Sequence, residues 1–191
     1  VVTVRALLLS HGAGSDRDHA TLVAIEERLA PLPVVRVNFP YRDRPGRRPP
    51  DRMPVLIASL RSHLRDVCDS VGCEPDEVVV GGRSMGGRVA SMMVAEGTPA
   101  AGWIAIGYPL HPPGRPERLR TDHLPLVGVP TLLISGDRDP FGTPDELAAA
   151  AALVAGAVTM RTIPGGRHEL KGADTVVADE IVGWLGSLAT P

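Results

Sequence analysis

The residues best suited to chemistry form a G-x-S-x-G pattern, Gly82-Arg83-Ser84-Met85-Gly86. An apolar run ends just before the pattern, and apolar residues at helical spacing follow it. A nucleophilic serine on a tight strand-to-helix turn requires this order, because larger neighbours would clash there. Such a turn raises Ser84 Oγ above the sheet and leaves the amide of Met85 free to donate to an oxyanion. The alternative interpretation is a glycine-rich turn that contains a serine by chance.

A serine hydroxyl needs an adjacent base, because it is a weak nucleophile at neutral pH. His168 is the candidate base. It follows the last predicted strand in Pro164-Gly165-Gly166-Arg167-His168, where a glycine-rich loop can bend the imidazole towards Ser84. The alternative is a solvated loop histidine.

A carboxylate should hold this imidazole in the correct tautomer. The segment Asp137-Arg138-Asp139-Pro140 follows the penultimate predicted strand and offers two carboxylates. Asp139 is favoured, because Pro140 fixes the loop after it, and Asp137 is the fallback; either could instead be a turn residue. The order serine, aspartate, histidine along the chain matches that of the α/β-hydrolases.

The first predicted strand ends in Ser10-His11-Gly12-Ala13-Gly14. The backbone of this glycine-rich turn can supply a second oxyanion donor. The amide of Ala13 is favoured over those of Gly12 and Gly14. The alternative is a simple turn between strand and helix, and the role depends on Ser84 being the nucleophile.

Ligands of parallel sheets bind beyond the carboxyl ends of the strands. Four of the chain's six aromatic residues follow predicted strands there and are expected to form an apolar wall: Phe39, Tyr41, Tyr108 and Phe141. Gly12 and Arg83 are expected to contact the substrate with them. For any single aromatic residue, ordinary loop packing is the alternative.

An arginine-rich loop leaves the sheet on the same side and contains Arg42, Arg44, Arg47 and Arg48. Together with Arg83, these side chains could attract an acyl substrate that bears a carboxylate or phosphate. The alternative is a solvated loop whose charge is offset by Asp43 and Asp51.

Short aliphatic runs alternate with segments of helical period. Strands are predicted at residues 1–9, 34–39, 77–80, 101–106, 130–135 and 158–163, and helices at residues 18–30, 54–71, 84–96, 144–152 and 174–188. This alternation predicts the α/β class, a three-layer sandwich with helices on both faces of a mainly parallel, six-stranded twisted sheet. Proline-rich surface loops are expected at residues 41–52 and 108–124.

Length and composition limit the domain organisation and the classes of partner that the chain can have. The 191 residues, 43% of them hydrophobic, suit one domain over residues 1–191. A formal charge of −2 argues against nucleic acid or membrane surfaces as partners, and no apolar run approaches a membrane span. Cys68 and Cys73 suit neither a zinc site nor a disulfide framework, and no histidine pair has metal-ligand spacing. No signal peptide is recognised, so a cytoplasmic protein without metal or cofactor is expected.

The chain resembles the α/β-hydrolase superfamily, above all its small, cap-less branch near the dienelactone hydrolases. Within that branch it is similar to a hydrolase-like family shared by bacterial proteins, a testis-expressed vertebrate protein and a subunit of the NSL chromatin complex. The resemblance is carried by His11-Gly12-Ala13-Gly14, residues 81–87, Gly107-Tyr108-Pro109-Leu110-His111-Pro112-Pro113 and Asp139-Pro140-Phe141-Gly142.

The resemblance implies a catalytic triad of Ser84, Asp139 and His168, with an oxyanion hole near Ala13 and Met85. It spans nearly the whole chain but departs from the superfamily at the start, where the antiparallel strands that commonly open the fold are missing. No insertion is long enough for a lid domain. The relative in the chromatin complex suggests that some members serve as scaffolds.

These observations predict a serine hydrolase that cleaves a small ester or thioester through an acyl-enzyme intermediate. Its partner would be a small-molecule acyl substrate, and the protein would be a monomer or homodimer. Two alternatives remain. One is a non-catalytic α/β-hydrolase-like scaffold or binding protein, and the other is an acyltransferase that uses the same triad with an alcohol or amine in place of water.

Overall fold

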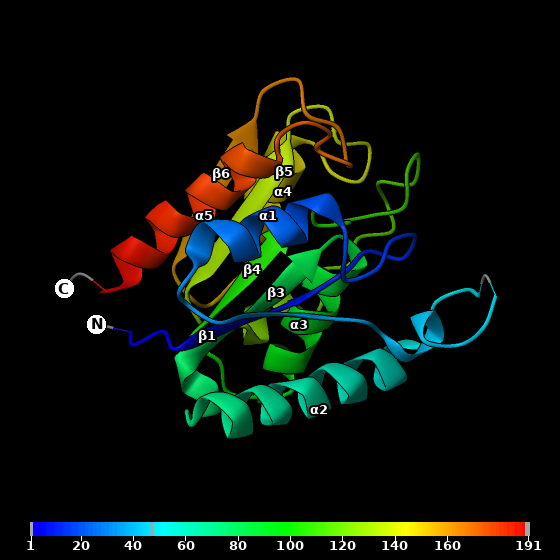
Figure 1. The fold of residues 1–191 in the computed structure, drawn as a ribbon. Coiled ribbons are helices and arrows are strands. Elements are labelled where there is room, and N and C mark those ends of the chain that lie inside the picture. The colour runs from blue at the N-terminus through cyan, green and yellow to red at the C-terminus, as the bar shows by residue number, and fades with distance from the viewer. Residues whose placement is uncertain (1, 47, 190–191) are drawn as a thin grey trace.

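The computed structural model describes residues 2–46 and 48–189, with the side chain of Ala189 excepted (Figure 1). The start of the first predicted strand at Val1 and the predicted role of Arg47 therefore lie outside the described residues.

The described residues form six strands and five α-helices that alternate along the chain. The strands are β1 (Ala6–Ser10), β2 (Val34–Val37), β3 (Val78–Arg83), β4 (Gly102–Ile106), β5 (Thr131–Gly136) and β6 (Val158–Ile163). The helices are α1 (Ala20–Leu29), α2 (Met53–Val71), α3 (Met85–Ala95), α4 (Pro144–Ala151) and α5 (Asp174–Ala189). Short 3-10 helices lie at η1 (Pro40–Arg42), η2 (Pro75–Glu77) and η3 (Leu124–Leu126).

All pairings in the sheet are parallel, in the order β2-β1-β3-β4-β5-β6. The predicted fold class is therefore confirmed. Because every strand runs the same way, the loops that follow the strands meet at one edge of the sheet. In this register Ser10, at the end of β1, lies opposite Val37 of β2 and Gly82 of β3.

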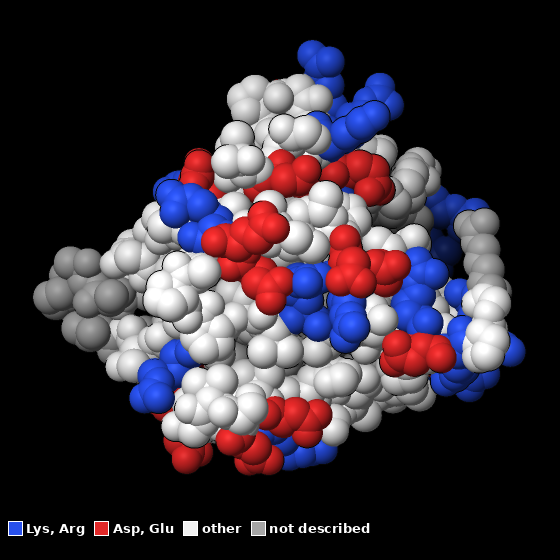
Figure 2. Space-filling view, viewed as in Figure 1, with Lys and Arg blue, Asp and Glu red and all other residues white. Residues whose placement is uncertain are grey.

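Alternate residues of the central strands point to opposite faces of the sheet and belong to two separate hydrophobic cores. Leu7 and Leu9 pack with α1 and α5 on one face of the sheet. Ala6 and Leu8 pack with α2, α3 and α4 on the other face. Figure 1 shows the two layers, with α1 and α5 side by side in front of the sheet. The outer surface of this front layer carries interspersed acidic and basic side chains (Figure 2), among them the ion pair of Arg28 with Asp179 at 2.7 Å.

Several strand boundaries differ from the prediction. The third strand continues to Arg83 rather than ending at residue 80, and the fourth and fifth strands each begin one residue later. The differences are larger at the first and second strands. The first strand begins at Ala6, and the described residues before it form no ladder, although Arg5 donates its amide to Glu77 O at 2.8 Å. The second strand ends at Val37 rather than at residue 39. There the amide of Phe39 donates to His11 Nε2, and Pro40 has no amide hydrogen with which to continue the pairing.

The turn between β3 and α3 consists of one residue, Ser84, with φ 47° and ψ −114°. Few residues other than glycine adopt a positive φ, so this backbone is strained. The turn also lies against β1. A Cβ atom on Gly82 or on Gly86 would collide with the backbone carbonyl oxygen of Ser10. Glycine on both sides of Ser84 is therefore a packing requirement.

His123 fastens the long loop between β4 and β5 to α3. Ser91 Oγ donates to Arg88 O at 2.8 Å, so His123 Nε2–H donates to Ser91 Oγ, 2.7 Å away. Burial, with the charge of Arg88 as a second cause and Asp122 opposing both, lowers the pKa of His123 to about 4. The imidazole is therefore neutral in the folded protein near neutral pH.

Across the described residues, no helix is both long and apolar enough to span a membrane.

The first prediction concerns Gly86. Gly86→Ala should lower the free energy of unfolding by roughly 1–3 kcal/mol, because the added methyl group meets the backbone of β1. The matched control is Gly183→Ala in α5, where a Cβ meets no atom within 4 Å. It should raise stability by about 0.5–1 kcal/mol. Urea unfolding measures both changes, and an unchanged midpoint for Gly86→Ala would contradict the close approach.

The second prediction concerns acid. The unfolded histidine titrates near the ordinary value of 6.5, whereas His123 in the folded protein titrates at about 4. Between these values the unfolded state binds more protons, so stability that is present above pH 6.5 is lost as the pH falls towards 4. His123→Gln keeps an N–H donor but removes the titration. The urea midpoint of the variant should fall less steeply over this window, and parallel curves would rule the explanation out.

Candidate active site

Three side chains from the carboxyl edge of the sheet form a continuous chain of hydrogen bonds. Ser84 Oγ lies 2.8 Å from Nε2 of His168. On the other side of the ring, Nδ1–H donates to Asp139 Oδ2 at 2.8 Å and to Oδ1 at 3.1 Å. The carboxylate thus fixes the tautomer in which Nε2 can accept the serine proton.

The carboxylate of Asp139 is fixed in turn by its own loop. The residue is only 3% exposed, and its Oδ1 accepts the amide of Phe141 at 2.8 Å. Asp137 is exposed, and no hydrogen bond joins it to His168. Of the two carboxylates that the sequence offered, the structure brings Asp139 to the imidazole.

The phenyl ring of Phe141 covers His168, with ring centroids 4.0 Å apart and planes tilted by 31°. The backbone of His168 is held separately. Its carbonyl oxygen accepts a hydrogen bond from Arg83 Nη2 at 3.1 Å. The imidazole therefore has fixed partners at its ring nitrogens, on one ring face and at its own backbone.

Arg83 was expected to contact substrate. In the structure, both terminal nitrogens of its guanidinium have partners within the protein. Its side chain is 3% exposed, and besides His168 it contacts His19 Nε2 at 2.7 Å and Glu169 Oε2 at 3.3 Å. Its Nε is buried without a hydrogen-bond partner. Burial and the nearby Arg83 charge lower the pKa of His19, so the ring accepts from the guanidinium. Arg83 thus joins the strand before Ser84 to the loop that carries His168.

The glycine-rich loop after β1 is held against Ser84 by His11. A Cβ atom on Gly12 would lie 3.4 Å from Ser84 Cβ. His11 Nδ1–H donates to Gly12 O at 2.7 Å, while Nε2 accepts the amide of Phe39 at 3.1 Å. Burial lowers the pKa of His11, so the ring stays neutral, as this pair of contacts requires.

The hydroxyl of Tyr41 fixes the next residue of the same loop, donating to Ala13 O at 2.9 Å. Burial raises the pKa of Tyr41, which keeps the hydroxyl protonated. No hydrogen bond to another described residue occupies the backbone amide of Ala13 or of Met85. Both remain free to donate to an oxyanion at Ser84.

The aromatic wall predicted from the sequence is mostly core. Phe39, Tyr41 and Tyr108 are 0%, 1% and 3% exposed and pack in the cluster beneath α2 and α3. They are absent from the lining of the cavity at Ser84, because they are buried among other apolar side chains of that cluster. Of the four, only Phe141 lines it.

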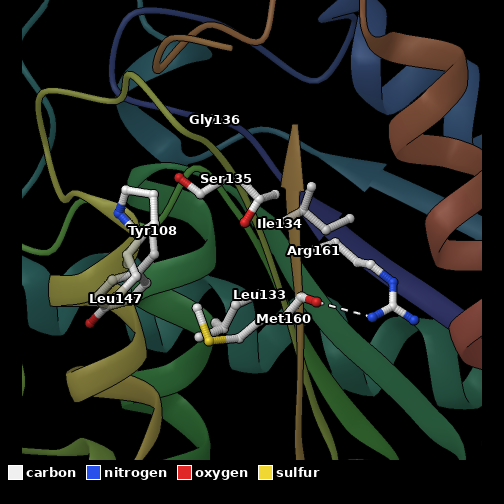
Figure 3. A pocket seen from close by; sticks show the side chains of 10 residues that line it. Tyr108, Leu133, Ile134, Ser135, Gly136, Leu147, Met160 and Arg161 are labelled. Carbon is white, nitrogen blue, oxygen red and sulfur yellow. Dashed lines mark hydrogen bonds between the residues drawn. The ribbon is translucent and has the colours of Figure 1, made fainter. Parts of the chain in front are cut away.

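The cavity at Ser84 has a volume of about 410 Å³. Its lining comes from the loops after β1, β3, β5 and β6: Gly12, Ala13, Gly14, Ser15, His19, Arg83, Ser84, Phe141, His168 and Glu169. A second cavity, between β5, β6 and α4, is shown in Figure 3 and measures about 10 Å³. That is room for one water molecule at most, so it is no ligand site. Among the described residues, no three His, Cys, Asp or Glu side chains gather as a metal site would require.

Sequence reasoning missed the supporting roles of His11, His19 and Tyr41. Each makes contacts across 28 or more residues of sequence, as the bond between His11 and Phe39 and that between Tyr41 and Ala13 illustrate. The available signal for His11 was its place directly after an apolar strand. For His19 and Tyr41, no local pattern points to their partners.

Comparison with solved structures places the fold among esterases and related enzymes. A monoacylglycerol lipase from Paleococcus ferrophilus is 15% identical, with a TM-score of 0.79 over 98% of this chain and 96% of that chain. A dienelactone hydrolase from Anabaena variabilis is 22% identical, with a TM-score of 0.74 over 97% and 87%. A thermophilic esterase from Thermogutta terrifontis is 20% identical, with a TM-score of 0.73 over 98% and 92%.

At these identities the likeness establishes the fold alone. The narrower similarity to the testis-expressed protein and the chromatin-complex subunit stays a prediction. A family model adds an independent finding, since the alpha/beta hydrolase domain matches residues 3–179, which is most of the chain. The chain therefore belongs to the alpha/beta hydrolase domain family.

Proposed function

We propose that the protein is a serine hydrolase that cleaves a small ester or thioester. The observation that carries the proposal is the unbroken path of hydrogen bonds from Ser84 Oγ through His168 to buried Asp139. A hydroxyl and an imidazole in contact are not enough by themselves, since Ser91 and His123 also touch. Ser84 differs from Ser91 in lining an open cavity and in having a carboxylate behind its histidine.

In the first half of the reaction, Ser84 Oγ attacks the carbonyl carbon of the substrate while His168 Nε2 takes the hydroxyl proton. Asp139 stabilises the imidazolium that forms. The amides of Met85 and Ala13 donate to the oxyanion of the tetrahedral intermediate. When the intermediate collapses, His168 returns the proton to the departing alcohol or thiol, which leaves the acyl group on Ser84.

In the second half, His168 takes a proton from a water molecule, and the resulting hydroxide attacks the acyl carbonyl. The same two amides hold the second oxyanion. Collapse of this intermediate breaks the bond to Ser84 Oγ, and His168 returns the proton to the serine. The products are a free acid and the starting enzyme.

The dimensions of the site favour small substrates. The cavity of about 410 Å³ is at the lower end of the range for small-molecule sites, and no inserted domain covers it within the described chain. Phe141 supplies an apolar surface beside His168. Similarity in fold to an esterase and to a monoacylglycerol lipase supports ester bonds as the substrate class.

A scaffold without catalytic activity has no need to keep these three groups in contact. A large separation between Ser84 and His168 would favour the alternative of a scaffold protein. The observed distance between Ser84 Oγ and His168 Nε2 is 2.8 Å, which is within hydrogen-bond reach. The hydrolase is therefore the better supported of the two.

Removing the nucleophile tests the proposal. Ser84→Ala should lose labelling by a fluorophosphonate probe and reduce hydrolysis of p-nitrophenyl esters to background, because no hydroxyl remains to attack. Ser91→Ala, which removes the other serine in contact with a histidine, should retain both. Labelling that persists in Ser84→Ala would refute the assignment, and esters of an added alcohol appearing in place of free acid would indicate an acyltransferase.

Exchanging each carboxylate separately tests the acid. Asp139→Asn should lower kcat by roughly 10³- to 10⁴-fold, because an amide no longer holds the imidazole in the productive tautomer. Asp137→Asn is the matched control, and its kcat should stay close to that of the wild type because this side chain is exposed. Equal losses in the two variants would count against the role of Asp139.

A further inference from the structure

A cleft that is distinct from the small cavity of Figure 3 adjoins the cavity at Ser84. The two share Ala13 and Gly14 in their linings, so the glycine-rich loop after β1 forms the boundary between them. The second cleft has a volume of about 570 Å³ and is otherwise lined by Arg42, Arg48, Pro49 and Pro50. A substrate bound at Ser84 can therefore extend past the glycine-rich loop into this second space.

The charged side chains that line this cleft are both arginines. The two carboxylates of the same loop are not among the lining residues and have other partners. Asp51 pairs with Arg44 at 3.1 Å, and Asp43 accepts from Asn38 Nδ2 at 3.2 Å. Within the described residues, neither Arg42 nor Arg48 forms an ion pair. The lining of the cleft therefore carries two positive charges that no ion pair neutralises. Basic side chains gather around the loop at the right-hand edge of Figure 2.

Arg42 is held in position before any ligand arrives. Its Nε donates to Ser15 O at 2.6 Å, and its guanidinium lies 5.7 Å from the ring centroid of Tyr41. These contacts leave its two terminal nitrogens without an acceptor among the described residues. A guanidinium fixed at Nε and free at the other end is suited to donate two parallel hydrogen bonds to an oxyanion.

Arg48 also lines this cleft, and its exposed side chain donates from Nε to Pro45 O at 3.3 Å. Pro49 and Pro50 follow it and restrict the backbone at this wall. Two arginines on opposite ends of one short, proline-limited loop thus border a space that opens onto the site of reaction.

We propose that this cleft is a subsite for an anionic group, a carboxylate or phosphate, carried by the ester or thioester that Ser84 attacks. The inference rests on the proposed hydrolase function and adds the charge of the substrate to it. The anion lies beyond Ala13 and Gly14 from Ser84, so it is separated from the scissile carbonyl by several bonds. An ester with an anionic arm is preferred over a neutral ester of equal length.

Three substrates test the subsite. They are neutral p-nitrophenyl pentanoate, p-nitrophenyl hemiglutarate, whose five-carbon acyl chain ends in a carboxylate, and pentanoyl-coenzyme A with phosphates on the thiol side. The variant is Arg48→Glu, which reverses a charge on an exposed side chain and spares the fold. The matched control is Arg65→Glu, exposed on α2 and outside the cleft lining.

The readout is kcat/KM for each anionic substrate divided by kcat/KM for the neutral ester. In Arg48→Glu this ratio should fall by roughly tenfold or more, the scale of one charge-assisted hydrogen bond, while Arg65→Glu keeps the wild-type ratio. Added salt should lower the wild-type ratio by screening the arginines. A fall for hemiglutarate alone places the anion on the acyl side, and a fall for the coenzyme A thioester alone places it on the leaving group.

The experiment distinguishes a failure of the proposed subsite from a failure of the proposed hydrolase function. If the subsite is wrong, all substrates turn over and the ratio in Arg48→Glu equals that in Arg65→Glu. If the hydrolase is wrong, no substrate turns over and a fluorophosphonate leaves Ser84 unlabelled.

Discussion

The close approach of the β3–α3 turn to the end of β1 is the constraint on which the site depends. Ser84 occupies a strained backbone conformation at φ 47°. The close approach is possible because Gly82 and Gly86, two positions before and after it, lack a Cβ that would strike Ser10. The strain is sustained by its surroundings. The central strands β1 and β3 are buried along their whole lengths between the two helical layers. A rigid sheet thus presents the serine hydroxyl at a fixed height above its edge.

Around that turn, three buried side chains each hold one backbone carbonyl of a neighbouring loop. His11 donates to the carbonyl of Gly12, Tyr41 to that of Ala13, and Arg83 to that of His168. None of these contacts requires a ligand. Fixing the loop carbonyls fixes the amides and the imidazole attached to the same loops, which is the preorganisation that oxyanion stabilisation needs. The buried polar side chains at this edge of the sheet therefore hold the loops around Ser84 in position.

The sequence was sufficient for the architecture because its signals are local. Aliphatic runs and helical periods predict six strands and five helices in the observed order, and the glycines around Ser84 predict the turn. The same logic identified Asp139 and His168 as loop residues after β5 and β6, and the structure brings both to Ser84.

Features that depend on contacts between distant segments were not predictable. The rings of Phe39, Tyr41 and Tyr108 follow strands as pocket residues do, yet they turn into the core, and nothing in their neighbours distinguishes the two directions. Arg83 was expected to contact substrate from its place beside Ser84, and it does line the cavity there, but it also has a role inside the protein. Its partners His19 and Glu169 lie 64 and 86 residues away, so its internal role emerged only from the folded chain.

The most direct test of the central claim is to catch the acyl group on its acceptor. Rapid acid quench of the protein during turnover of a p-nitrophenyl ester, followed by mass spectrometry of peptides, locates the covalent intermediate. We predict one acyl adduct, on the peptide that contains Ser84, formed as fast as p-nitrophenol appears in the first turnover. Hydrolysis that proceeds with no adduct, or with the acyl group on another residue, would contradict the account.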